Sequence, residues 1–328
     1  IGVRLVGSEM CIRDRCLVQS HRLNQRSQNL SALATHMSGR VRAFLELMRL
    51  KNVFLAAITV PLGAQFAIGD EWISDYLPDV VIQIFAVIFF IGAGNTMNDI
   101  KDSDIDKTAH PSRPIPSQRI SIEEAKYFTW ALWILSIACV LYGTFELYNN
   151  EMEWYPLITI YVLAVGLMLS YDHGPKTKDS GLIGNVSISL MVGAVILYGA
   201  STVSSINSTL VWWTASVVFF TNLAREIVKD CQDMESDEGI RQTLPMKIGL
   251  QNSRMAAYVI IMASLVCLYM PYWRGPFEFG QIFFQIPAIL TLITLNRPLY
   301  EGKDALVAGR IRAAMLLGLI GFIVPMYV

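Results

Sequence analysis

Long apolar runs recur along the chain from residue 52 onward, and short polar connections separate them. A helix that crosses the hydrocarbon core of a bilayer needs about 20 predominantly apolar residues. About nine runs approach this length, and they cover residues 52–70, 80–97, 127–146, 155–171, 182–202, 208–225, 255–272, 279–295 and 311–328. The pattern predicts an all-α, polytopic membrane protein with about nine transmembrane helices.

The composition agrees with this class. Of the 328 residues, 53% are hydrophobic and only 16% are charged, and the mean hydropathy is +0.43. A water-soluble fold would be left with too little polar surface. The five cysteines, Cys11, Cys16, Cys139, Cys231 and Cys267, lack the paired spacing of a zinc site or a secreted disulfide framework. We therefore expect free thiols that pack among apolar neighbours.

Basic residues are distributed unevenly between alternate connections. One set of connections covers residues 71–79, 147–154, 203–207 and 273–278. It contains only Arg274, whereas the opposite set, counted with the residues from Met37 to the first run, contains 20 basic residues. Because short cytoplasmic loops are enriched in lysine and arginine, we predict a cytoplasmic amino terminus and an external carboxyl terminus. The formal net charge of −1 gives no indication of a nucleic-acid partner.

The first 36 residues differ in character from the rest. The letters "GSEMCIRDR" resemble the translation of a transposase adapter used in sequencing libraries, so we expect residues 1–15 not to be natural protein. The polar stretch that follows lacks the apolar core of a signal peptide, and Met37 is a natural start. We predict that residues 1–36 are an artefact or an untranslated segment, with a disordered basic tail as the alternative, and that residues 37–328 form one membrane domain.

An acidic motif, "NDIKDSDID" at residues 98–106, follows directly on an uncharged apolar run. If the helix continues, at ~100° per residue Asp99, Asp102 and Asp106 fall within an arc of roughly 60°, and Asp104 points to the other side. Asn98 lies at one margin of that face. An EF-hand calcium loop starting at Asp102 is excluded, because its sixth and twelfth positions require glycine and glutamate and are lysine and arginine here.

A second motif, "REIVKDCQDMESD" at residues 225–237, repeats this spacing. Asp230, Asp233 and Asp237 have the same separations, Glu226 joins their face, and Lys229 occupies the place of Asn98. Carboxylates three and four residues apart repel each other, so a cation should offset the repulsion. Clustered carboxylate oxygens suit Mg²⁺, which commonly binds through one or two carboxylates and the phosphates of a substrate. The repeat therefore predicts a diphosphate substrate that is bridged to the protein by metal.

The connection after the first motif is predicted to be non-helical. The letters "HPSRPIPS" include Pro111, Pro114 and Pro116, which favour an extended chain. Ser121 and Glu124 have the spacing of a capping box, which predicts that the next helix begins there.

The motifs "NDIKDSDID", "RPIPS" and "DCQDMESD" resemble the paired aspartate-rich motifs of the UbiA superfamily of intramembrane prenyltransferases. With "GLIGNVSISLMVG", they look most like the archaeal digeranylgeranylglyceryl phosphate synthases. This resemblance implies a UbiA-like bundle with cytosolic aspartate-rich loops, which transfers a geranylgeranyl group from geranylgeranyl diphosphate to the hydroxyl of geranylgeranylglyceryl phosphate in ether-lipid biosynthesis. Gln118 departs from the family pattern, which usually has glycine at this place.

The spacing and the resemblance together lead us to expect three sets of site residues and two Mg²⁺ ions. The expected catalytic residues are Asp102, Asp230, Lys176, Lys229 and Tyr171. The expected ligands of substrate phosphates are Arg49, Arg113, Lys178, Asn98 and Arg225. The expected metal ligands are Asn98, Asp99, Asp102, Asp106, Asp230, Asp233 and Asp237. Lys51 is an alternative to Arg49 at the start of the first run. The expected partners are a prenyl diphosphate, a lipid acceptor and the bilayer, and no obligate protein partner is evident.

Two alternatives remain open. An aromatic acceptor, as in quinone or haem biosynthesis, would require a site for a planar ring instead of a second lipid phosphate. A membrane transporter is disfavoured, because transporters place ionisable groups near the bilayer midplane and the interiors of these runs are almost free of acids.

Overall fold

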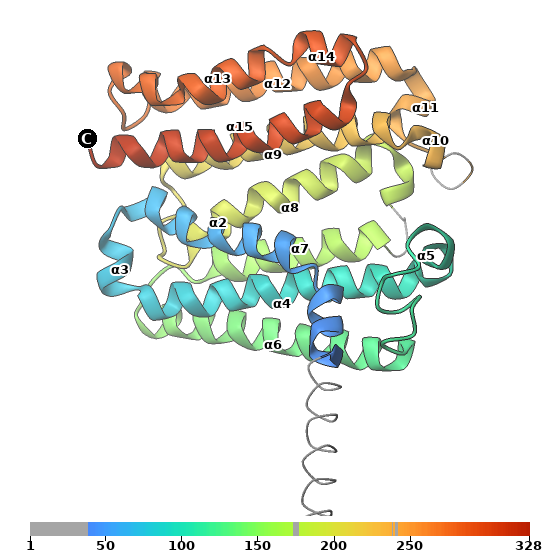
Figure 1. Ribbon diagram of the computed structural model, residues 1–328. Helices are drawn as coiled ribbons and strands as arrows, with labels where there is room; N and C mark the ends of the chain where they lie inside the picture. The colour runs from blue at the N-terminus through green and yellow to red at the C-terminus, as the bar shows by residue number, and fades with distance from the viewer. Residues whose placement is uncertain (1–38, 173–176, 238, 240–241) are drawn as a thin grey trace, which may run out of the picture. The chain divides into compact units, whose positions relative to one another are not determined.

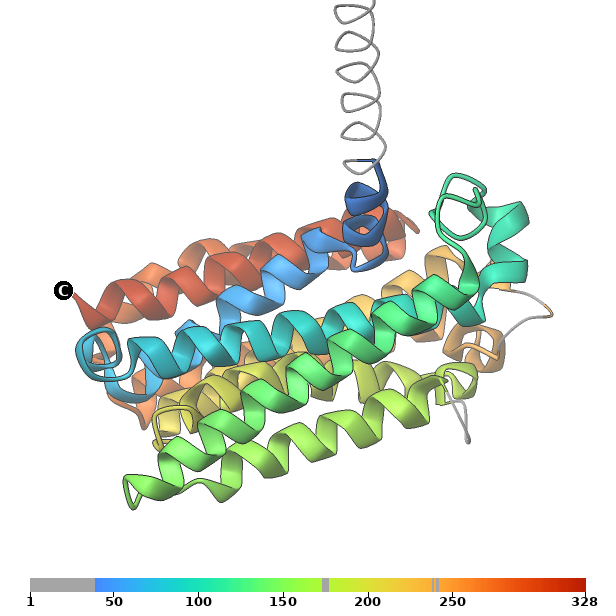
Figure 2. The same cartoon turned by 90° about the horizontal axis from the view of Figure 1, so that it is seen from below.

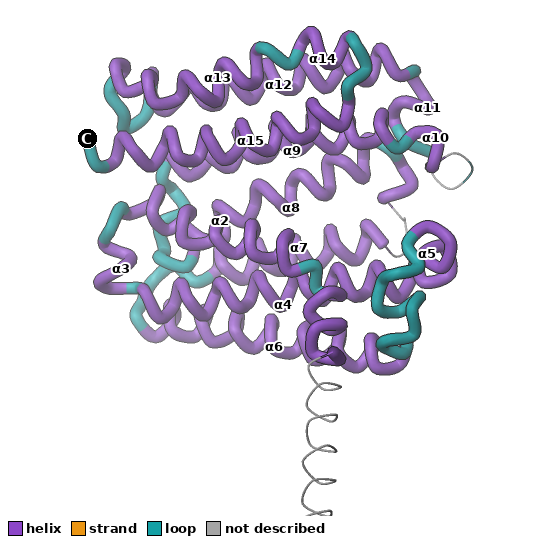
Figure 3. Tube along the Cα trace, in the orientation of Figure 1, coloured by secondary structure: helices purple, strands orange, loops and turns teal. Residues whose placement is uncertain are grey.

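The computed structural model describes residues 39–172, 177–237, 239 and 242–328. These residues form helices and the turns that join them (Figure 3). They divide into two compact units. The described part of unit 1 is residues 39–50 and Asn95–Thr129, and unit 2 comprises Lys51–Gly94 and Trp130–Val328. The predicted artefact at residues 1–36 and the predicted start at Met37 lie outside the described residues.

The helices of the chain are α2 (Leu50–Ile68), α3 (Glu71–Asp75), α4 (Leu77–Lys101), α5 (Ser103–Ala109), α6 (Ile122–Asn149), α7 (Tyr155–Asp172), α8 (Leu182–Ser201), α9 (Thr209–Gln232), α10 (Met234–Asp237), α11 (Leu244–Ile248), α12 (Leu250–Trp273), α13 (Ile286–Ile293), α14 (Asn296–Tyr300) and α15 (Asp304–Ile323). Residues 39–47 are also helical. Short 3₁₀ helices cover Thr177–Ser180, Phe279–Gln285 and Val324–Met326.

Each of the predicted apolar runs coincides with helical structure over most of its length. Among the described residues, six helical segments are long and apolar enough to cross a membrane, and two shorter apolar helices cover Ala56–Ile68 and Tyr155–Tyr171. The six are Leu77–Lys101, Ile122–Asn149, Leu182–Ser201, Leu250–Trp273, Phe279–Tyr300 and Asp304–Met326. The all-α membrane class is therefore confirmed, whereas a count of nine spans stays a prediction.

Helix α9 lies at the centre of the packing in unit 2. It contacts α8, α12 and α15, and most of its residues are buried. The helices of this unit run along a common direction, with α10 and α11 at the opposite end from α3 and the carboxyl terminus (Figures 1 and 2). Large apolar side chains such as Trp130, Ile134 and Val259 are exposed. Exposed apolar side chains are the expected outer surface of a membrane protein, because lipid replaces water around the spans.

Small residues allow α2 and α8 to approach closely. A Cβ atom on Gly63 would meet the backbone of Ile196 and Gly199, and one on Gly199 would meet the backbone of Val60. Membrane helices commonly pack through such small residues, because van der Waals contact replaces the hydrophobic effect between them. Three cysteines of the described part, Cys139, Cys231 and Cys267, are free thiols.

Unit 1 has a small core of its own. Ala43 and Leu47 from the helical residues 39–47 pack with Ile115, Ile120 and Ala125. Helix α6 begins at Ile122 with the predicted capping box. The Glu124 amide donates to Ser121 Oγ, and the Ser121 amide donates to Glu124 Oε2 at 2.9 Å. The predicted start of this helix is confirmed.

The proline-rich connection corrects one expectation. Residues 110–121 are non-helical, as predicted, but they are not extended, because they form a succession of turns. The Ser117 amide donates to Arg113 O, and the Arg119 amide donates to Pro114 O, each at 3.0 Å. Proline fixes φ near −65°, which also suits the first central position of a β-turn. The three prolines therefore excluded a helix without determining which non-helical form the chain takes.

Candidate functional site

The first aspartate motif lies where α4 gives way to α5. Asp99 is in the last turn of α4, Asp106 is in α5, and Asp102 is the residue between the two helices, with φ −86° and ψ 7°. The Asp102 amide donates to Asn98 O, and Asp102 O accepts from the Asp106 amide, both at 2.9 Å. The helix on which the spacing argument was conditioned does not continue unbroken through residue 106, because α4 ends at Lys101 and α5 begins at Ser103. Hydrogen bonding nevertheless passes through Asp102, so the two helices are joined without a loop.

Arginines neutralise the buried carboxylates of this motif. Asp99 and Asp106 are only 3% and 4% exposed. Arg49 Nη2 lies 2.5 Å from Asp99 Oδ1, and Arg113 Nη1 lies 2.5 Å from Asp106 Oδ2 and 3.6 Å from Asp99 Oδ1. Asp104 is 90% exposed and pairs with Lys107. Arg49 and Arg113, which we expected to bind substrate phosphates, are thus bound to the aspartates in this structure.

Asn98 also contacts its own motif. Its Nδ2 donates to Asp102 Oδ2 at 3.0 Å. Asp102 is half-buried, between the buried Asp99 and the exposed Asp104. The Asn98 side-chain NH₂ group therefore orients the central carboxylate of the motif. This bond does not use the Asn98 side-chain oxygen, which is of a type that can coordinate a cation.

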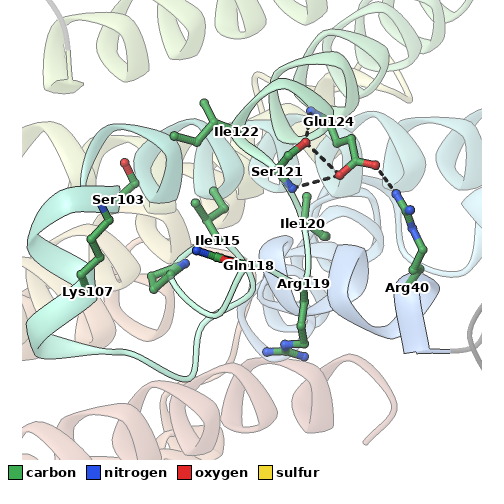
Figure 4. A pocket seen from close by; sticks show the side chains of 11 residues that line it. Arg40, Ser103, Lys107, Ile115, Gln118, Arg119, Ile120, Ser121, Ile122 and Glu124 are labelled. Atoms are coloured by element: carbon green, nitrogen blue, oxygen red, sulfur yellow. Dashed lines mark hydrogen bonds and ion pairs between the residues drawn. The ribbon is translucent and has the colours of Figure 1, made fainter.

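The turn after the motif contains a strained residue. Gln118 has φ 60°, in the left-handed region that favours glycine. This conformation explains why a glycine suits the position in the family that the sequence resembles. Gln118 lines a cavity of about 570 Å³ with Arg40, Ser103, Lys107, Ile115, Pro116, Arg119, Ile120, Ser121, Ile122 and Glu124 (Figure 4).

The cations around this cavity already have carboxylate partners. Arg40 pairs with Glu124, as Figure 4 shows. Arg119 lies 2.7 Å from Glu46, and Lys107 lies 2.7 Å from Asp104. The cavity therefore has no excess of positive charge that would recruit an anion, and we assign it no ligand.

The second aspartate motif repeats the backbone of the first. Asp230 lies in the last turn of α9, Asp237 ends α10, and Asp233 is the residue between them, with φ −94° and ψ 5°. The Asp233 amide donates to Lys229 O at 2.9 Å, and Asp233 O accepts from the Asp237 amide at 3.0 Å. In both motifs the middle aspartate is thus the junction between a long helix and a short one.

The side-chain partners of the second motif are different. Asn185 of α8, which is 9% exposed, donates its amide to Asp230 Oδ2 at 2.7 Å. Glu226 accepts from Arg225 Nη1 at 2.5 Å and from Lys229 Nζ at 2.8 Å. Burial raises the pKa of the Asp230 carboxyl to about 6, helped by the nearby carboxylates of Glu226 and Asp237 and opposed by the Asn185 hydrogen bond. Asp230 thus lies in an environment that favours neutralisation by a proton or a cation.

Asn185 is a site residue that the spacing argument missed. It lies within the stretch "GLIGNVSISLMVG" that supports the family resemblance, but nothing in the local pattern places it beside Asp230, 45 residues further along the chain. A buried amide in an otherwise apolar span is the only sequence signal, because such groups need a hydrogen-bonding partner.

The structure describes only some of the remaining residues that we expected at the site. Tyr171 is half-buried in the last turn of α7. Lys176 and the side chain of Lys178 lie outside the described residues, so their expected contacts with phosphate stay predictions. Glu235, on the opposite face from Asp233, is exposed.

The carboxylate oxygens of the motifs suit an open Mg²⁺ site that is completed by water and substrate phosphates. Among the described residues, no three histidine, cysteine or acidic side chains form a closed metal site. Mg²⁺ usually keeps several waters and binds through one or two carboxylates with substrate phosphates, which does not require such a site. The hydrogen bond from Asn185 uses Asp230 Oδ2, so Oδ1 remains a donor for a cation.

Known proteins match the chain over most of its length. It is 30% identical over 312 residues to digeranylgeranylglyceryl phosphate synthase of Methanosarcina mazei, covering 88% of this chain and 99% of the relative. It is 32% identical over 235 residues to the protein of the same name from Pyrococcus horikoshii, covering 70% and 77%.

Two solved structures show the same fold. One, described as giving structural and mechanistic insights into the biosynthesis of digeranylgeranylglyceryl phosphate synthase in membranes, has a TM-score of 0.71 at 27% identity and covers 88% of this chain and 98% of its own. A UbiA homolog from Archaeoglobus fulgidus bound to GPP and Mg²⁺ has a TM-score of 0.59 at 18% identity and covers 84% and 99%. A model of the UbiA prenyltransferase family matches residues 56–323. The resemblance inferred from the aspartate motifs is thereby confirmed, and the chain belongs to the UbiA prenyltransferase family.

Proposed function

We propose that this enzyme transfers a geranylgeranyl group from geranylgeranyl diphosphate to the hydroxyl of geranylgeranylglyceryl phosphate and releases pyrophosphate. The strongest support for this function is the repeated motif. At two helix ends, aspartates have the same spacing, and the middle aspartate joins a long helix to a short one. The near full-length match to a digeranylgeranylglyceryl phosphate synthase supports the choice of substrates.

The site that we propose uses both motifs. We assign metal binding to Asp99, Asp102, Asp106, Asp230, Asp233 and Asp237, with Asn98 as an additional oxygen donor. When bound there, two Mg²⁺ ions would neutralise the diphosphate and favour its departure as pyrophosphate. We propose that both motifs bind the same diphosphate.

The protein's own side chains have three tasks in this reaction. We assign stabilisation of the departing pyrophosphate to Lys176, Lys229 and Tyr171, and contacts with phosphate oxygens to Arg49, Arg113, Lys178 and Arg225. The bond from the allylic carbon to the diphosphate oxygen breaks, and the acceptor hydroxyl oxygen forms a new bond to that carbon. The hydroxyl proton leaves to a carboxylate, for which the half-buried Asp102 is our candidate, or to the departing diphosphate.

A direct assay tests the substrate assignment. Purified protein in detergent with Mg²⁺ and radiolabelled geranylgeranyl diphosphate is given either geranylgeranylglyceryl phosphate or an aromatic acid. We expect labelled product with the lipid phosphate alone. Product with the aromatic acid alone would replace this function with aromatic prenylation, and label in neither product would contradict both.

A further inference from the structure

Two arginines occupy facing helices in unit 2, each near the end of a long apolar segment. Arg225 belongs to α9 and Arg312 to α15, and these helices pack against each other. The side chains that flank the two arginines belong to one buried cluster, which includes Ala224, Ile227, Val228, Val307, Ala308 and Ile311.

The two arginines lie at a similar depth. The end of α9 and the start of α15 lie at the same end of unit 2 (Figures 1 and 2). At 1.5 Å per residue, Arg225 is about 10 Å from the end of α9 and Arg312 about 12 Å from the start of α15. Charged side chains inside membrane spans are costly and face a functional partner by default. Arg312 lies within the candidate span Asp304–Met326 and Arg225 lies at the end of the apolar run 208–225, so this pair on adjoining helices requires an explanation.

The local charges do not balance. The Arg225 side chain is only 17% exposed and donates to Glu226 Oε1 through Nη1. Its Nε is buried and has no acceptor among the described residues. Glu226 is already shared with Lys229, and Asp230 accepts from Asn185.

Arg312 adds a further positive charge to this group. The structure records no ion pair between Arg312 and any residue that it describes, and Arg312 is close enough for its charge to act on Arg225. Among the described residues, Glu226 pairs with both Arg225 and Lys229, and Arg312 adds a positive charge with no carboxylate of its own. An unpaired donor on a buried guanidinium is unfavourable, so an anion that binds at Arg225 and Arg312 would remove both the repulsion and the unpaired donor.

We propose that Arg225 and Arg312 bind the phosphate of the acceptor lipid, and this proposal rests on the proposed function. A phosphate monoester presents three oxygens to two guanidinium groups, whose planar arrays of donors bind phosphate in a bidentate manner without a metal. The donor diphosphate, in contrast, is assigned to the aspartates and Mg²⁺. Arg312 then determines specificity for a phosphorylated acceptor.

Arg312→Gln tests this assignment, because Arg312 is exposed and its replacement leaves the core of α15 intact. We expect the KM for geranylgeranylglyceryl phosphate to rise about 10- to 100-fold, because the variant loses a hydrogen-bonded contact between charged groups. The KM for geranylgeranyl diphosphate and the Mg²⁺ dependence should not change. The preference for the phosphorylated acceptor over geranylgeranylglycerol should fall by the same factor.

Arg310→Gln is the matched control. Arg310 is exposed on the same helix and lies about 200° around it from Arg312. We expect wild-type kinetics in this variant. An unchanged acceptor KM in Arg312→Gln, or a rise confined to the KM for geranylgeranyl diphosphate, would overturn the proposal.

A binding measurement separates this proposal from the proposed function. Inorganic phosphate is titrated without Mg²⁺ or donor in a neutral detergent, and the thermal midpoint is recorded. We expect phosphate to stabilise the wild type and Arg310→Gln but not Arg312→Gln. If the wild type shows this dependence yet does not use the phosphorylated acceptor, the anion site stands and the proposed function fails. Equal stabilisation of all three proteins, or of none, would overturn the site.

Discussion

The two aspartate motifs have the same backbone and different neutralising partners. In each, the middle aspartate joins a long helix to a short one. In the first motif, Arg113 binds Asp106 and lies 3.6 Å from Asp99, which also binds Arg49. In the second motif, the buried Asp230 accepts a hydrogen bond from the neutral amide of Asn185. The same spacing of carboxylates therefore occurs with the same local backbone conformation in both motifs. The groups that compensate each charge come from residues distant in the sequence.

Because their partners differ, the two motifs should affect the stability of the substrate-free protein differently. A buried carboxylate that is paired with a guanidinium contributes to the stability of the fold, and removal of one partner is costly. A buried carboxylate whose pKa is raised destabilises the fold when it ionises. We infer that Arg49 and Arg113 compensate the first motif in part and that the second motif, where Asp230 has a neutral partner, depends more on an added cation.

Activity should depend on both motifs despite this difference. We expect Asp102→Ala and Asp230→Ala each to lower kcat/KM by about 100-fold or more, because each removes a ligand of the charged diphosphate complex. Asp104→Ala and Glu235→Ala are controls, since both residues are exposed beside the motifs. Radiolabel transfer at saturating Mg²⁺ measures the effect. Retained turnover in both motif variants would show that the aspartates are not catalytic.

Stability should separate the motifs. Arg113→Met leaves Asp106 buried without its guanidinium and should lower the free energy of unfolding by about 3 kcal/mol. Asp106→Asn in the same chain should recover part of that loss. Lys107→Met, which breaks the exposed pair with Asp104, should cost less than about 1 kcal/mol. Denaturant titration in detergent compares the variants, and equal effects of Arg113→Met and Lys107→Met would contradict the compensation that we infer.

A substitution in the second motif should instead raise the free energy of unfolding. Asp230→Asn removes a buried charge and keeps an acceptor for Asn185, so the metal-free protein should gain about 2 kcal/mol at pH 7. A raised pKa means that the stability from protonated Asp230 is present at low pH and is lost as the pH rises through about 6. The difference between variant and wild type should therefore shrink as the pH falls below about 6 and vanish only below the unfolded value of 3.8. A variant that is less stable than the wild type at pH 7 would refute this reading.

The turns after the motifs allow a smaller test. Gln118 has φ 60° after the first motif, whereas Gly239, with φ 80°, occupies the left-handed region after the second. Gln118→Gly should raise the free energy of unfolding by about 1 kcal/mol, because it removes the steric cost of a side chain in this region. Gly239→Gln should have the opposite effect. Thermal unfolding measures both variants, and destabilisation by Gln118→Gly would show that its side chain has another role.

Local sequence signals predicted much of the fold. The apolar runs located the helices, and the Ser121 and Glu124 capping box located the start of α6. These predictions succeeded because each depends on residues within a few positions of one another. The spacing of the aspartates also placed Asp104 on the exposed side of its motif.

Features that depend on distant residues could not be predicted in this way. Arg49 pairs with Asp99 across 50 positions, and Asn185 with Asp230 across 45. The break in the helix at Asp102 was also missed, because helical periodicity continues through a single junction residue whose hydrogen bonds are maintained. The proline-rich connection was predicted to be extended because proline restricts φ but leaves ψ to be decided by the surrounding contacts.

A structure determined with Mn²⁺ and an unreactive thiolo analogue of geranylgeranyl diphosphate would test whether the two motifs share one site. Anomalous scattering would locate the metal ions. We expect ions in direct contact with carboxylate oxygens of both motifs, with one diphosphate between them. Ions bound to one motif alone, or motifs too far apart to contact the same diphosphate, would contradict the proposed active site.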